Sequence, residues 1–319
     1  LREFASKGFL PGYGFPSNIV AFDHYNISAY KKDKRRKETK TRDDNVQMSR
    51  DLPSRDIVTA LREYAPGADV VLDGAVNRAE GITLNWHVPS SVKDVKESQA
   101  IKYAWRCHKC GFSGSTYDMH SAFICEECGS KIKQSDIEHY LEPAGFSVDF
   151  NSSIHNDVTS QTYIPIEKPW IQAHGSWVPL LNPTLGKYRT TTSGNIFNFS
   201  KGIHGEGYAL CLMCGRSEPM DKDGNLPKKF KKGNTHKKLR GGSDDSNLCP
   251  GSKSDFAIKK GIALGHQSST DILQIVLKDV HGEWLVNKNI AATLAIVLRD
   301  SLAELLGIQN QELLLLLLV

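Results

Sequence analysis

Apolar residues recur with helical spacing in two segments of the chain. Between residues 50 and 64, Ile57, Leu61 and Tyr64 lie at positions i, i+4 and i+7, Ser54 is a candidate N-cap, and a Pro-Gly pair follows. After Asn287 or Asn289, a longer apolar stripe runs to a stop at Gly307. Its members are Ile290, Leu294, Val297, Leu298, Leu302 and Leu305. These patterns predict a short helix and a C-terminal amphipathic helix.

Other segments have the composition of β-strands. Residues 19–22 and 69–72 are short apolar runs, and residues 265–277 place Leu273, Ile275 and Leu277 on one face of a strand. Residues 136–210 combine aromatic side chains with prolines and many Thr, Ser and Asn, which indicates short strands in an irregular β region. Trp170 and Trp177 in this region are more often core residues than base-stacking platforms, because large aromatic side chains are mostly buried.

The predicted fold class is therefore α+β, in a chain of several modules that bound zinc stabilises. Residues 1–100 form an α+β accessory module, which begins with a Gly- and Pro-rich turn, and 101–135 form a zinc ribbon. Residues 136–205 form the irregular β module, and 206–319 form a second zinc-binding module with the C-terminal strand and helix.

The cysteines carry the most specific signal in the sequence. Cys107 and Cys110 form one Cys-x-x-Cys pair, and Cys125 and Cys128 form a second pair after fourteen intervening residues. A glycine follows each pair, which lets backbone amides turn toward the sulfurs. Two such knuckles complete a tetrahedral shell of four thiolates, as in zinc ribbons.

Three other interpretations explain these four cysteines less well. A thioredoxin-like redox motif uses one pair at a helix start and leaves the second pair unexplained. Structural disulfides belong to secreted proteins, and the total of seven cysteines is odd. Buried apolar cysteines do not occur as paired doublets.

The remaining three cysteines predict a second zinc site. Cys211 and Cys214 form a knuckle before a glycine, and Cys249 lies far downstream. His236 lies between them and would complete a Cys3His shell, while His204 is the substitute. A closed four-ligand shell is structural, so we expect no metal hydrolase. The sequence also contains no P-loop, nucleophile elbow or His-Glu-x-x-His motif.

Composition places the chain among globular proteins. Its 319 residues are 39% hydrophobic and carry 40 Lys plus Arg against 36 Asp plus Glu, enough for two or three domains. No run of about 20 apolar residues predicts a membrane span. The start has neither an initiator Met nor a signal peptide, so we expect a soluble, cytoplasmic piece of a longer protein.

Two segments concentrate the positive charge. Eight basic residues lie in 31–42 and seven lie in 228–240. Each segment is either a solvated, mobile loop or a contact for the phosphate backbone of DNA. The candidate nucleic-acid-binding residues are Lys34, Arg35, Arg36, Lys37, Lys228, Lys229, Lys231 and Lys232.

Several motifs together resemble a known family. They are Phe9-Leu-Pro-Gly-Tyr-Gly-Phe-Pro16, Leu61-Arg-Glu-Tyr-Ala-Pro-Gly67, the three Cys-x-x-Cys pairs, Cys214-Gly215-Arg216, Leu264-Gly-His-Gln-Ser-Ser-Thr-Asp271 and Leu306-Gly-Ile308. In this order they resemble the C-terminal region of bacterial DEAD/DEAH-box helicases with an MrfA-like zinc-binding domain. That family includes mitomycin-repair helicases and phage-defence proteins of the Druantia and DISARM type.

The resemblance implies an ATP-driven DNA helicase or translocase whose motor, with its ATP and Mg²⁺, precedes Leu1. It implies DNA and other defence-system subunits as partners, and it assigns the cysteines above to zinc. His236 stands where the family has a cysteine. The alternative is a non-enzymatic subunit whose zinc modules only hold a partner protein.

Overall fold

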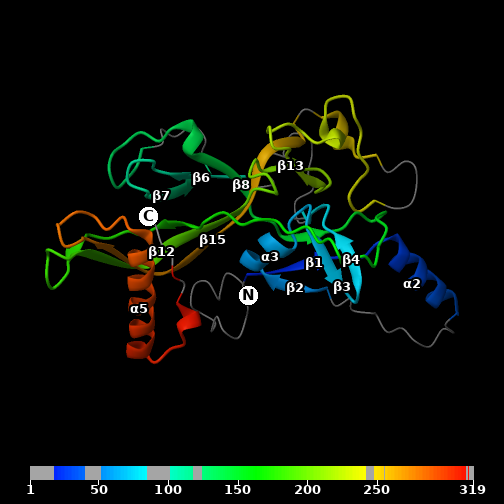
Figure 1. The fold of residues 1–319 in the computed structure, drawn as a ribbon. Coiled ribbons are helices and arrows are strands. Elements are labelled where there is room, and N and C mark those ends of the chain that lie inside the picture. The colour runs from blue at the N-terminus through cyan, green and yellow to red at the C-terminus, as the bar shows by residue number, and fades with distance from the viewer. Residues whose placement is uncertain are drawn as a thin grey trace. The chain divides into compact units, whose positions relative to one another are not determined.

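The computed structural model describes residues 18–39, 52–84, 101–117, 124–241, 248–254, 256–313 and 315 (Figure 1). The chain divides into two compact units. Unit 1 comprises residues 1–170 and 197–267, and unit 2 comprises residues 171–196 and 268–319. The module boundaries near residues 100, 135 and 205 stay predictions, and the turn at residues 8–16 lies outside the described residues.

A four-stranded sheet forms one core of unit 1. Its order is β2 (Ser54–Asp56), β1 (Ile19–Asp23), β9 (Gly145–Ser147) and β5 (Gly81–Ile82). β1 runs parallel to β9 and antiparallel to β2. Helix α3 (Ile57–Glu63) buries Ile57 and Leu61, and Tyr64 stacks on Phe22 of β1 with ring centroids 5.0 Å apart. The predicted strand at 19–22 and the predicted apolar helix face are both confirmed.

The start of α3 corrects the sequence prediction. Residues 54–56 are extended because they pair with β1, so the helix begins only at Ile57. Asp56 is the N-cap in place of Ser54, and its side chain accepts a hydrogen bond from the backbone N–H of Val58 at 2.9 Å. Residues 50 and 51 of the predicted helix lie outside the described residues.

The predicted strand at 69–72 is confirmed as one arm of a hairpin. β3 (Asp69–Leu72) pairs antiparallel with β4 (Ala75–Arg78). Asp73 and Gly74 between them have φ of 50° and 74°. Two consecutive positive φ values are what a two-residue hairpin loop requires, and Asp-Gly is a preferred pair for it.

A larger sheet contains the two longest strands. Its path is β10 (Trp170–Gln172), β12 (Gly186–Ser200), β15 (Ile258–Leu277), β8 (Ile137–Leu141), β6 (Lys102–Arg106) and β7 (Ser113–Thr116). β13 (Tyr208–Cys211) pairs with β15 and with β14 (Ser217–Pro219), and β11 (Val178–Pro179) pairs with β12. The strand predicted at 265–277 is therefore the second part of β15, and β12 is longer than the short strands expected for this region.

An aromatic cluster in unit 1 packs against this sheet. Tyr140, Phe197 and Phe199 are buried together, and Trp170 contacts Phe199 with ring centroids 4.9 Å apart. A Cβ at Gly265 of β15 would come within 2.7 Å of the Phe199 ring and 2.9 Å of the Tyr140 ring. A glycine is therefore needed where these rings cross the strand. Trp170 and Trp177 are both half-buried. Trp170 packs against this aromatic cluster, in line with the expected core role, whereas Trp177 belongs to none of the described core clusters.

Unit 2 contains the predicted amphipathic helix. α5 (Lys288–Leu306) has Asn287 as its N-cap and Gly307, with φ of 68°, as its left-handed C-terminal residue. Its apolar stripe is largely exposed, with Val297 at 56% and Leu305 at 82%, and among its described residues only Ala303 is buried. None of the helices in the described part of the chain is long and apolar enough to cross a membrane. Predominant sheets with few helices confirm the α+β class.

Candidate metal centres

The first centre is built by two knuckles with the same backbone pattern. One connects β6 to β7, and in it Gly111 donates to the carbonyl of Cys107 at 2.8 Å while Cys107 donates to Phe112 at 2.8 Å. In the other, Gly129 donates to Cys125 at 2.8 Å and Cys125 donates to Ser130 at 2.9 Å. Both glycines have positive φ, 75° and 68°, which allows the chain to turn back under the sulfurs.

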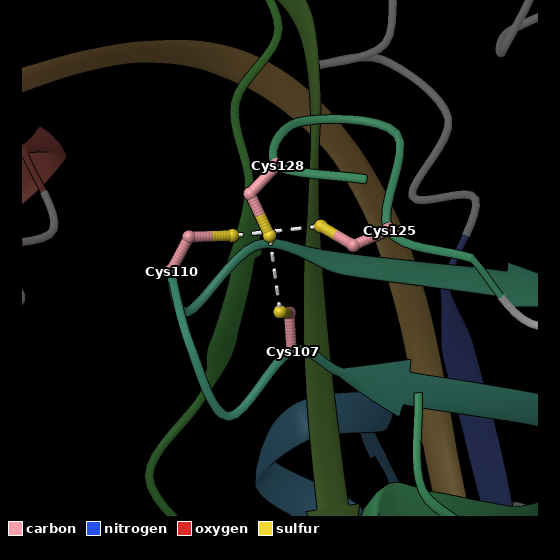
Figure 2. Close-up of side chains that lie close together, drawn as sticks. All are labelled: Cys107, Cys110, Cys125 and Cys128. Carbon is pink, nitrogen blue, oxygen red and sulfur yellow. Dashed lines mark hydrogen bonds between the residues drawn. The ribbon is translucent and has the colours of Figure 1, made fainter. Parts of the chain in front are cut away.

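The four sulfurs of the first centre converge (Figure 2). The Sγ atoms of Cys107 and Cys128 are 3.6 Å apart, those of Cys110 and Cys125 are 3.5 Å apart, and all four lie within 4.8 Å of one another. A tetrahedron with Zn–S bonds of about 2.3 Å has S···S edges of about 3.8 Å, whereas a disulfide needs about 2.05 Å. The spacing therefore fits a shared metal ion and excludes disulfide pairing.

The surroundings of this centre shift the pKa values of two of its thiols in opposite directions. Hydrogen bonds from the side chain and backbone of Ser130 lower the pKa of Cys128 to about 6, and loss of hydration raises the pKa of Cys110 to about 12. The cluster is backed by Trp105, Phe112 and Ile132, which are buried. A divalent cation at the centre of the group would favour the thiolate form of every ligand.

The second centre repeats the knuckle at the end of β13. Gly215, with φ of 78°, donates to the carbonyl of Cys211 at 2.8 Å, and Cys211 donates to Arg216 at 2.9 Å. Cys249 arrives from the turn before the 3-10 helix η3 (Pro250–Lys253). A Cβ at Gly251 of η3 would lie 2.7 Å from the sulfur of Cys211, so only a glycine fits so close to the knuckle.

His236 completes this second group. Its Nε2 lies 3.5 Å from the sulfur of Cys214, and the sulfurs of Cys211 and Cys249 are 3.7 Å apart. Tetrahedral Zn–S and Zn–N bonds of about 2.3 and 2.05 Å imply an S···N edge of about 3.6 Å. The structure thus brings together all four residues predicted for the site, and His204 is exposed outside the group.

The electrostatics of the second centre also favour a bound cation. Hydrogen bonds from Cys211 and Cys214 lower the pKa of Cys249 to about 3. Hydrogen bonds with Cys214 and Cys249 raise the pKa of Cys211. A metal ion bound by these residues would favour the thiolate form of all three cysteines.

Two residues that the sequence analysis did not assign support this centre. Ser252 of η3 accepts a hydrogen bond from the backbone N–H of His236 at 3.0 Å, and the buried ring of Phe230 packs against the imidazole with centroids 5.3 Å apart. Neither residue belongs to a metal-ligand motif, so residue type and spacing gave no signal for them. Both act by fixing the position of His236.

Arg216, directly after the second knuckle, anchors it to the rest of unit 1. Its guanidinium donates to Asp149 at 2.6 Å, to Glu80 at 3.0 Å and to the carbonyl of Lys237 at 2.9 Å. The side chain is only 3% exposed. The Cys-Gly-Arg sequence was noted in the family resemblance, but only the structure shows that the arginine binds two acids and the segment that carries His236.

The first basic segment is a helix where the sequence analysis expected a loop. Lys34, Arg35, Arg36 and Lys37 lie on α2 (Ile27–Thr39), which the side chain of Asn26 caps by accepting from the N–H groups of Ser28 and Ala29. The helix forms because Asn26 satisfies its first amides and no Gly or Pro interrupts residues 27–39. Lys34 and Arg35 are exposed, whereas residues 40–42 and the side chains of Arg36 and Lys37 lie outside what the structure describes.

The second basic segment is anchored by its own aromatic residue. Lys228 and Lys229 belong to the 3-10 helix η2 (Lys228–Phe230), whose Phe230 is buried against the second centre, and Lys231 and Lys232 follow it. All four lysines are exposed. Lys229 pairs with Glu218 at 2.6 Å and lies 3.6 Å from Glu80, so part of its charge is used within the chain. The expected mobile loop is thus an ordered turn at this point.

The chain is similar to one part of a much longer known protein. No family model and no solved structure matches the chain significantly. The chain is 25% identical over 311 residues to Druantia protein DruE of Escherichia coli strain UMEA 4076-1. The match covers 92% of this chain and 15% of that protein, so the chain spans about 15% of the length of the curated relative it matches.

Proposed function

We propose that the chain is a zinc-binding accessory region of a bacterial anti-phage defence protein, and that its parent polypeptide is an ATP-dependent DNA helicase or translocase. The similarity to a Druantia protein over most of this chain supports the defence role. The match to only 15% of that protein leaves ample length elsewhere for a motor with its ATP and Mg²⁺. The protein acts in the cytoplasm, where invading phage DNA is found.

The observation that carries the zinc role is the preformed geometry of the two centres. Each has four ligand atoms at tetrahedral spacing, and neither leaves a fourth position for water or substrate. Zinc in such closed sites stabilises the fold. The second centre joins Cys211 to Cys249 across 38 residues of sequence and holds the intervening segment against β13.

In this role the exposed cations contact DNA. Positive charge comes from Lys34 and Arg35 on α2 and from Lys228, Lys231 and Lys232 beside the second centre. The aromatic side chains of these segments pack within the chain, Tyr30 against Phe150 and Phe230 against His236. Such cationic contacts bind phosphates and position the duplex, but they carry no sequence information. We therefore infer nonspecific backbone binding next to the motor.

A second function is favoured by one observation. The apolar stripe of α5 is largely exposed, with Leu294, Val297 and Leu298 at 38%, 56% and 43%. A non-enzymatic interaction subunit of a defence complex would present such a face to a partner protein. The complete reading frame separates the two functions, because a motor requires a Gly-Lys-Thr/Ser loop and an Asp-Glu-x-His box.

Phage-plating and ATPase measurements on the complete protein test the proposal. We expect paired variants Cys107→Ser with Cys110→Ser, and Cys211→Ser with Cys214→Ser, to abolish protection in cells that carry the defence system. The wild-type protein should hydrolyse ATP faster when DNA is added. Protection that persists after both zinc centres are removed would contradict the accessory role, and the absence of any ATPase motif or DNA-stimulated hydrolysis would favour the interaction subunit.

A further inference from the structure

Unit 2 contains a group of aromatic and cationic side chains that neither the zinc centres nor the basic segments include. Trp177 precedes β11, Lys187 and Arg189 lie on β12, and Lys278 and Trp284 flank the turn that follows β15. Backbone pairing brings them together, since Pro179 is opposite Lys187 and Lys278 is opposite Trp284. We call these five residues the Trp–Lys cluster.

The cations of the Trp–Lys cluster lie over the indole rings. The Lys187 ammonium is 4.7 Å from the centroid of Trp177 and 5.5 Å from that of Trp284. Lys278 lies 5.1 Å from Trp284, and the guanidinium of Arg189 lies 4.5 Å from Trp177. Each indole therefore has two cations within cation–π distance, and Trp284 is still 47% exposed.

Two of the three cations of the cluster, Lys187 and Lys278, have no carboxylate partner within the described residues. The adjacent carboxylate of Asp279 uses its Oδ1 to accept from the backbone N–H groups of His281 and Glu283, which closes the turn. Two ammonium groups thus remain available to an anionic ligand beside an exposed aromatic face.

A small open pocket lies between these side chains. It has a volume of about 200 Å³ and is lined by both tryptophans and both lysines together with Pro179, Pro183 and Gly186. Pockets that enclose a whole small molecule measure roughly 300–1,000 Å³. This pocket therefore suits one unit of a longer chain.

Gly186 makes the close approach of the strands at this pocket possible. Its φ is 140°, and a Cβ at this position would lie 2.1 Å from the carbonyl oxygen of Val276. Lys278 donates from its backbone N–H to the carbonyl of Leu185 at 2.9 Å, which fixes the two strands at this distance. The pocket is therefore a rigid feature of paired strands, which preorganises it for a ligand.

We propose that the Trp–Lys cluster is a binding site for single-stranded nucleic acid, in which a base stacks on an exposed indole face and the flanking phosphates bind Lys187 and Lys278. Each nucleotide supplies both an aromatic face and a negative charge, which is the combination that this cluster complements. An acidic peptide supplies charge without the ring. The inference deepens the proposed function and rests on it for its biological setting, because a DNA translocase must hold a separated strand.

Binding of a fluorescein-labelled oligothymidylate to the 319-residue chain, measured by fluorescence anisotropy, tests the site. Trp284→Leu and Trp177→Leu should each weaken binding about five- to 100-fold, while Trp284→Phe, which keeps a ring, should lose less. Lys187→Gln and Lys278→Gln should weaken binding and flatten its dependence on salt, because each removes one phosphate contact. Intrinsic tryptophan fluorescence should be quenched by the oligonucleotide in the wild-type chain.

Matched variants separate stacking from a general loss of charge or exposed ring. Phe256→Leu removes a ring that is 69% exposed outside the cluster, and Lys222→Gln removes an exposed cation outside it. Both should bind as the wild type does. If Trp284→Leu lowers the melting temperature, its weaker binding reflects misfolding, and the binding of Trp284→Phe and Lys278→Gln then tests the site.

Three outcomes would overturn the site. They are no binding of the oligothymidylate by the wild-type chain, equal binding by the tryptophan and Phe256 variants, or complete competition by polyglutamate, which would indicate a surface for acidic peptides. Failure of the site is distinguishable from failure of the proposed function. Zinc content and phage protection would persist in the first case, and the oligonucleotide would still bind in the second.

Discussion

The hydroxyl of Ser252 lies 3.0 Å from Nδ1 of His236. This contact occupies one ring nitrogen and leaves Nε2, which lies 3.5 Å from the sulfur of Cys214, to face the thiols. A metal-binding histidine commonly hydrogen-bonds through its second nitrogen, because the bond fixes the tautomer and the ring orientation. The pair therefore has the arrangement expected of a zinc ligand and its support.

Ser252→Ala should weaken zinc at the second centre without abolishing it. Loss of such a supporting hydrogen bond typically costs about 10- to 100-fold in metal affinity. Competition with a chromogenic chelator should therefore show one zinc ion released earlier than in the wild type. Ser254→Ala, on the same turn but outside the group, is the matched control and should leave both ions unchanged.

His236→Cys and His236→Ala distinguish a ligand from a packed core histidine. Cysteine supplies a thiolate and should retain zinc at this centre, whereas alanine should lose it. Metal analysis after gel filtration measures the difference. Wild-type zinc content in both variants would show that the centre needs no donor atom at residue 236 and that His236 only packs against Phe230.

The wild-type chain should contain two zinc ions. Each centre has a complete set of four ligand atoms, so washing the folded protein with a weak chelator should leave about two ions per chain. Cys110→Ser and Cys214→Ser should each reduce the content to about one and broaden or lower the thermal unfolding transition. A variant that keeps wild-type zinc and melting while losing activity would contradict the structural role.

The sequence predicted which side chains converge in the two centres, because metal chemistry restricts both residue type and spacing. The two Cys-x-x-Cys pairs supplied four ligands by themselves, whereas the three leftover cysteines required one more donor, and His236 lies between Cys214 and Cys249 in the sequence. Their supports could not be predicted in the same way. Ser252 and Phe230 reach His236 only after η2 and η3 fold around the centre, and many side chains could have filled those positions.

The ends of the helices were predictable where nearby residues determine them and unpredictable where distant residues do. The ends of α5 were predictable because Asn287 and Gly307 act within one turn of the chain. The start of α3 was not, because Ser54 is held in a strand by β1, which lies more than thirty residues earlier in the sequence. The density of charge in residues 31–42 predicts a solvated loop, whereas the Asn26 cap nucleates helix α2 there.

Removing Arg216 should destabilise unit 1 strongly. The Arg216 side chain is only 3% exposed, and its guanidinium binds both Asp149 and Glu80. Arg216→Ala removes this guanidinium and leaves both carboxylates without it. Breaking a buried ion pair by removing one partner typically costs about 3–5 kcal/mol. Chemical unfolding of zinc-loaded protein measures this loss. Arg55→Ala removes an exposed pair with Glu63 and should cost about 0–1 kcal/mol, so equal effects of the two variants would contradict the anchoring role.

The last prediction concerns the basic helix α2 and double-stranded DNA. Neutralising Lys34, Arg35, Arg36 and Lys37 together to Gln should weaken duplex binding to a similar extent across unrelated sequences, because phosphate contacts carry no base information. Each lost contact should reduce the slope of log affinity against log salt by about 0.9, and four lost contacts should reduce it by about 3.6. Binding measured at several salt concentrations gives both quantities.

A charge-matched variant makes this experiment specific to α2. Lys168, Lys222, Lys260 and Lys288 are exposed and dispersed along the chain, so changing them to Gln removes the same total charge without altering the helix. If α2 contacts the backbone, this control keeps most of the wild-type slope. If the helix is only a solvated basic surface, the two variants lose affinity equally, because only the net charge of the protein then affects the encounter with DNA. Equal slopes for the two variants would therefore reject the DNA contact at α2 while leaving both zinc centres and the Trp–Lys cluster to their own tests.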